Sequence, residues 1–78
     1  MRRGQVEMRV AILKSLEKNP RAATAIAGVT NIYYQTCKEM LETLASCGAV
    51  VRTGRKYDLT ELGRGALWDY EKLMKVLE

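Results

Sequence analysis

The stretch from Thr24 to Gly48 constrains the fold more than any other part of this chain. It begins with a short apolar segment that is interrupted at Gly28. A longer segment follows, with apolar residues at helical spacing, and it stops at Gly48. Two helical segments of this kind joined by a turn are typical of a helix-turn-helix, whose second helix can lie in the major groove of DNA.

The segment before this stretch predicts a scaffold helix over 5–18. Its apolar side is formed by Val6, Val10, Leu13 and Leu16, with Met8 and Ile12 beside them. Asn19-Pro20 predicts a stop, because the residue before a proline is pushed out of the helical region. Ahead of the helix, Arg2 and Arg3 are either a solvated terminus or a short basic arm that contacts phosphates.

Within the central stretch we expect a brief helix over 24–28, capped by Thr24 and ended by a turn at Gly28. Ile32 then enters the core, and a recognition helix covers 33–47, with Gly48 in the left-handed position that follows many helices. The inward side of this helix is formed by Cys37, Met40, Leu41 and Leu44.

Side chains that point outward from the first turns of the recognition helix are the candidates for base and phosphate contacts. They are Tyr33, Tyr34, Gln35, Thr36 and Lys38, with Glu39 on the same outward side. The alternative for the tyrosines is that one of them is a core aromatic with a solvated hydroxyl.

The segment 49–59 predicts a β-hairpin, since two strand-like runs flank a loop that contains Gly54. An isolated hairpin is unstable, so it must pack on the helices as a wing. Its candidate DNA contacts are Arg52, Thr53, Arg55 and Lys56. The alternative is that these charges are a solvated strand edge that prevents aggregation.

A last helix is predicted over 60–77, with Thr60 as its N-cap and Glu61 in its first turn. The helix carries more apolar surface than one flank of a small domain can bury, and this excess predicts a homodimer interface. The candidate interface residues are Leu67, Trp68, Tyr70, Leu73, Met74 and Leu77.

Size and composition narrow the remaining possibilities. The 78 residues suffice for a single domain over 1–78, and so small a core favours stabilisation by dimerisation. The net charge of +4 favours a polyanionic partner. The sequence has no histidine and only two cysteines, which argues against an enzyme, a metal site or a bound cofactor. Cys37 reads as a small core residue, whereas Cys47 is either buried or paired across a dimer.

No segment approaches the roughly 20 apolar residues that a membrane span needs, and no signal peptide is apparent. We therefore expect a cytoplasmic protein, associated with the nucleoid or, if viral, located in the host cytoplasm.

The order of helix, helix, helix, basic hairpin and helix resembles that of the archaeal winged-helix DNA-binding proteins. These include transcription regulators, related proteins of archaeal viruses and chromatin proteins that dimerise through a C-terminal coiled coil. The matching residues are Thr24, Ile26, Asn31, Ile32, Tyr34, Lys38, Leu41, Leu44 and Gly48, followed by Tyr57-Asp58-Leu59-Thr60 and Gly63. Tyr33 and Cys37 depart from the small polar residue and the leucine that are usual at these positions.

The resemblance implies a mainly α fold with a small β-hairpin (α+β), a winged helix-turn-helix. It implies a homodimeric transcription regulator that binds double-stranded DNA. One alternative is a sequence-tolerant chromatin protein, and another is a winged helix used for protein–protein contact.

Overall fold

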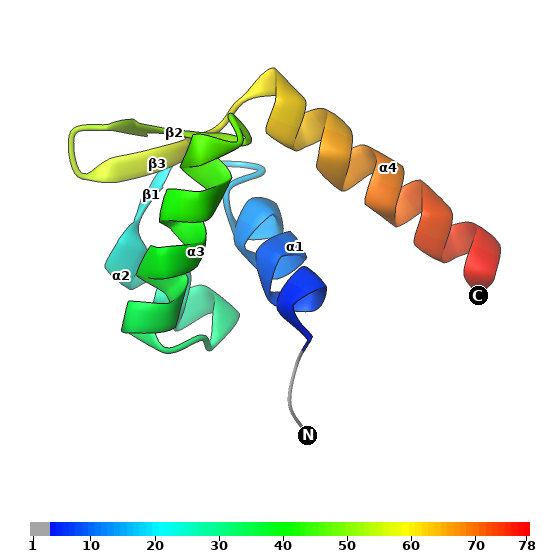
Figure 1. Cartoon of the computed structure of the whole chain (residues 1–78), viewed down its shortest axis with the longest axis horizontal. Helices are drawn as coiled ribbons and strands as arrows, with labels where there is room; N and C mark the ends of the chain where they lie inside the picture. The colour runs from blue at the N-terminus through cyan, green and yellow to red at the C-terminus, as the bar shows by residue number, and fades with distance from the viewer. Residues whose placement is uncertain (1–3) are drawn as a thin grey trace.

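Four helices and a small antiparallel sheet make up the fold in a computed structural model that describes residues 4–78 (Figure 1). The elements are α1 (Gln5–Ser15), β1 (Arg21–Ala22), α2 (Ala23–Thr30), α3 (Tyr34–Ser46), β2 (Val50–Thr53), β3 (Lys56–Leu59) and α4 (Glu61–Leu77). This order confirms the winged-helix architecture. Arg2 and Arg3, the predicted basic arm, lie outside the described residues.

The sheet has three strands rather than the two of the predicted hairpin. Its order is β1-β3-β2, with Arg21 opposite Tyr57 and Val50 opposite Leu59. The segment after Pro20 is therefore more than a connection, because two of its residues pair with the wing. A strand of two residues is too short to show the alternation by which strands are recognised in a sequence.

The first two helices differ at their ends from the prediction. Helix α1 stops at Ser15 rather than residue 18, because the chain must turn before Pro20 to reach β1. Helix α2 has Ala22 at its N-cap position with no side-chain cap, so Thr24 does not cap it. Helix α2 follows β1 directly, without an intervening loop.

The turn between α2 and α3 is made at Asn31, not at Gly28. Gly28 lies inside α2, and Asn31 adopts a left-handed conformation with φ of 59°. Asparagine tolerates this conformation better than most residues, and the Ile32 amide then donates to the Ala27 carbonyl at 3.2 Å. Ile32 is buried as predicted.

The core lies between α1, α2, α3 and the inner side of the wing. All four predicted inward residues of α3 are buried, as are Ile12 and Leu13 of α1 and Leu16 directly after it. Val6 is exposed, which corrects its placement on the apolar side. Leu67 of α4 is only 2% exposed, so this predicted interface residue belongs to the core of the single chain.

The junction between α3, the wing and α4 is held by backbone contacts. After α3, Gly48 has φ of +82°, and the amides of Gly48 and Ala49 donate to the carbonyls of Ala45 and Leu44 at 3.0 and 2.9 Å. Thr60 caps α4 as predicted, accepting from the Gly63 amide at 3.1 Å, and its hydroxyl also donates to the Gly48 carbonyl. A Cβ on Gly63 would lie 2.1 Å from the Ala49 carbonyl oxygen, so only glycine permits this approach.

The structure assigns the two cysteines different environments. Cys37 is fully buried, and burial raises the pKa of its thiol. Cys47, at the other end of α3, is exposed and unpaired within the chain.

Replacing Gly63 by alanine should destabilise the protein by about 1–3 kcal/mol or more, because the added methyl group collides with backbone rather than with a mobile side chain. Gly65→Ala is the matched control, since a Cβ there meets nothing within 4 Å and should stabilise α4 by about 1 kcal/mol. Urea unfolding followed by circular dichroism measures both changes. A neutral Gly63→Ala would contradict the close approach.

A thiol-alkylating reagent at neutral pH should modify Cys47 quickly and Cys37 only in denaturant, because alkylation requires an accessible thiolate. Mass spectrometry of digested protein would distinguish the sites. Equal labelling in the native protein would show that α3 does not bury Cys37.

Candidate nucleic-acid interface

Helix α3 presents two distinct faces. The buried face holds Cys37, Met40, Leu41 and Leu44 against the core. The opposite face is exposed and carries Tyr34, Gln35, Lys38 and Glu39, in agreement with the predicted outward positions. Thr36 is half-buried at the edge, which makes it less accessible to a partner than predicted.

Neither tyrosine at the start of α3 belongs to the core. Tyr33, which occupies the N-cap position, is 87% exposed, and Tyr34 is 45% exposed. The buried aromatic residue of this region is Tyr57 of β3. The two exposed tyrosines therefore leave aromatic surface at the tip of α3 that is free to contact a partner.

The structure brings the predicted helix and wing residues together around one hollow of about 320 Å³. Lys38 and Tyr34 approach it from α3, and Arg52 and Arg55 approach it from the wing. The remaining lining residues are Ala22, Ala23, Thr24 and Tyr57. Residues of the helix and of the wing, separate in the sequence, thus share one surface.

The electrostatics of this hollow favour an anion. Three of its lining side chains are cations and none is acidic. The start of α2 also lines it, and the first amides of this helix have no side-chain acceptor. Cations and free helix amides together are a common arrangement for binding a phosphate.

The wing ends in a tight turn, and one of its arginines is bonded to that turn. Gly54, the first of two loop residues, has φ of +64°, as expected for a two-residue hairpin loop of the type II′ class. The Arg52 Nε donates to the Gly54 carbonyl at 2.9 Å. Thr53 and Lys56 are exposed on the same hairpin but do not line the hollow.

Gln35 already has a partner within α3. Its Nε2 donates to Glu39 Oε1 at 3.4 Å, across one helical turn on the exposed face. This pair lies outside the cationic hollow, so the exposed surface of α3 divides into a cationic side near the wing and a polar line farther from it.

Sequence reasoning missed part of this interface. Thr24, the predicted cap of α2, instead has an exposed side chain that lines the hollow, and the edge of Tyr57 lines it too. Both positions belong to the matching residues of the family resemblance, but nothing in the sequence placed them at the interface, because they join it through the pairing of β1 with the wing.

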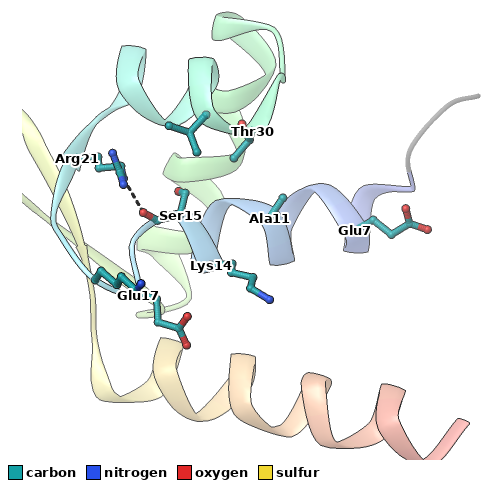
Figure 2. Close-up of a pocket in the computed structure, with 9 residues that line it drawn as sticks. Glu7, Ala11, Lys14, Ser15, Glu17, Arg21 and Thr30 are labelled. Carbon is teal, nitrogen blue, oxygen red and sulfur yellow. Dashed lines mark hydrogen bonds between the residues drawn. The ribbon is translucent and has the colours of Figure 1, made fainter. Parts of the chain in front are cut away.

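A second hollow of about 530 Å³ lies between α1 and α2 (Figure 2). Its charges are of both signs, including Glu7, Lys14, Glu17 and Lys18. Arg21, which also lines it, is engaged by the Ser15 carbonyl, to which its Nε donates at 2.7 Å. Because its charged side chains are of both signs, this hollow is a weaker candidate for a nucleic-acid contact than the one beside the wing.

Helix α4 projects past α1 (Figure 1). Several of its large apolar side chains are exposed. Trp68 is 65% and Leu73 55% exposed, and Met74 and Leu77 are exposed as well. Tyr70 is half-buried. The Lys14–Glu71 ion pair at 3.5 Å connects α4 to α1. A hydrogen bond from Arg64 Nη1 to the Glu17 carbonyl at 3.2 Å connects α4 to the segment after α1.

Across residues 4–78, no three Cys, Asp or Glu side chains are grouped so as to hold a metal ion. No helix in that range has the length and apolar character to span a bilayer.

Comparison with known proteins agrees with this architecture. A family model described as "Winged helix-turn-helix" matches residues 2–78. A solved structure titled "PigF with SAH" is similar in fold, with a TM-score of 0.69 at 18% sequence identity. The similarity covers 80% of this chain and 18% of that chain, so this chain spans less than a fifth of that protein. A comparison with curated proteins finds no match.

Proposed function

The chain belongs to the winged helix-turn-helix family, and from this premise we propose that it binds double-stranded DNA as a homodimer and regulates transcription. Helix α3 enters the major groove, and the wing contacts the adjacent phosphates. The chain works as a binding module and carries out no catalysis.

The observation that carries this proposal is the cationic hollow between α3, the wing and the start of α2. Lys38, Arg52 and Arg55 surround a space that can admit a backbone phosphate, with no carboxylate to repel it. A phosphate held there would lie beside the first turns of α3, where Tyr34 and Gln35 can reach base edges. Backbone contact and base contact would then come from adjoining surfaces.

Dimerisation is supported by the exposed side of α4. Leu62, Ala66, Leu73 and Val76 recur at spacings that keep them on one line of the helix, and all four are exposed. Trp68 lies about 140° around the helix from Leu73, so one helix–helix seam cannot bury both. We therefore assign the dimer interface to the line of residues that contains Leu73, and Trp68 is not part of it.

A two-fold dimer would place two recognition helices about one turn of DNA apart, which favours a roughly palindromic operator. A sequence-tolerant chromatin protein is the second candidate, because contacts through the cationic hollow are to the backbone and do not depend on sequence. Footprinting separates the two, since a regulator protects discrete sites and a chromatin protein coats the duplex.

Replacing Lys38, Arg52 and Arg55 together by alanine should weaken binding to every duplex. The slope of log affinity against log salt should fall in magnitude by about 0.9 for each hollow that no longer neutralises a phosphate, and so by roughly 2 for the dimer. Mobility-shift titrations over a range of salt concentrations measure this slope.

The matched control replaces Lys18, Lys72 and Lys75, which removes the same charge at exposed positions that do not line the hollow. Equal weakening in both triple variants would show that net charge, not the hollow, drives binding. A wild type that binds no duplex would favour a protein–protein role.

Leu73→Glu should convert the dimer to a monomer, because it introduces two carboxylates into an apolar seam. Lys72→Glu, at the neighbouring exposed position on a different face, should leave the dimer intact. Sedimentation velocity measures both masses, with reductant present to exclude a disulfide through Cys47. A monomeric wild type at micromolar concentration would refute the dimer proposal.

A further inference from the structure

The outermost line of α3 is acidic, although this helix is the one proposed to enter DNA. Gln35, Glu39, Glu42 and Ser46 follow one another at spacings of four, three and four, and all are exposed. At about 100° per residue they fall within an arc of about 60°, opposite the buried face. With Lys38 against Glu39 and Glu42, the helix has a net charge of −1.

Such a line cannot add to general DNA affinity, because carboxylates are repelled by phosphates. The line nevertheless occupies the crest of the helix, which in the major groove faces the base edges and lies farthest from the phosphate walls. A carboxylate is accepted there only where it meets a hydrogen-bond donor, and the donors available are the amino groups of cytosine N4 and adenine N6. Guanine O6 and thymine O4 are acceptors and would repel it.

The contact between Gln35 and Glu39 specifies how this crest would read DNA. One amide hydrogen of Gln35 is directed to Glu39 Oε1, which leaves Glu39 Oε2 free as an acceptor. Gln35 keeps its Oε1 and a second amide hydrogen, the combination that binds adenine N6 and N7. The pair can therefore contact two neighbouring bases, with Glu39 held in position by Gln35.

We infer that Glu39, positioned by Gln35, is a specificity determinant that selects an amino-bearing base, cytosine or adenine, next to the adenine contacted by Gln35. This inference rests on the proposed DNA-binding function. The carboxylates on the exposed line of α3 would disfavour DNA sequences that lack a donor at the right position, whereas the cationic hollow would attract any duplex.

The test compares wild type, Glu39→Gln and Glu42→Gln by selection from a random duplex pool, followed by affinity measurements on the selected and on scrambled DNA. The two substitutions are isosteric and remove the same charge from the same line of α3. Only Glu39 contacts Gln35, whereas Glu42 lies one further turn along the helix. Both side chains are exposed, so thermal melting should show that both variants fold normally.

Both variants should bind scrambled DNA tighter than wild type, by roughly two- to fivefold, because each loses one repulsive charge. Glu39→Gln alone should lose the preference at one base pair, by roughly tenfold or more, since glutamine can also donate to guanine or thymine. Gln35→Ala should lose the preference at that base pair and also the preference for adenine at the neighbouring one.

Each outcome has a distinct meaning. If Glu39→Gln keeps the wild-type motif, or if Glu42→Gln loses the same base pair, the inference is wrong and DNA binding stands. If wild type binds duplex DNA without selecting any motif, the inference also fails, and the chromatin role is favoured. If wild type binds no duplex at all, the proposed function itself has failed.

Discussion

The close approach of two backbone segments, Gly48–Ala49 and Thr60–Gly63, is the constraint on which the rest of the structure depends. Thr60 uses one hydroxyl to donate to the Gly48 carbonyl and to cap α4 through the Gly63 amide. The Thr60 amide donates to the Ala49 carbonyl at 3.1 Å, and the missing side chain of Gly63 allows the same carbonyl to approach α4. These contacts join the end of α3, the base of the wing and the start of α4 at one point.

This junction matters for the interface because the cationic hollow is assembled from separate elements. Lys38 belongs to α3, while Arg52 and Arg55 belong to a hairpin whose two ends are both held at the junction. The pairing of β1 with β3 attaches the start of α2 to the same hairpin. The base of the wing therefore holds three cations and the start of α2 around the same hollow. Without it, ordering the wing would cost entropy each time the protein bound.

Much of the fold followed from the sequence because its signals are local. The inward line of α3, the turn at Gly54 and the Thr60 cap are each specified by residues within a few positions of one another. The errors share a different cause. The strand β1, the burial of Leu67 and the hollow around Thr24 depend on which distant segment packs against them. The turn lies at Asn31 rather than at Gly28, and local sequence does not distinguish them because both residue types tolerate the left-handed conformation.

The distribution of charge links this architecture to recognition. A helix that supplied both attraction and readout would need cations along its crest, and cations bind phosphates wherever the helix rests. In this chain the crest of α3 is acidic, and the arginines lie on the wing. In the proposed mode of binding, attraction would bring the domain to any duplex, and α3 would settle only where base donors meet its carboxylates. The small net negative charge of α3 is thus compatible with selective binding, provided that the junction holds the wing and α3 in a fixed relative position.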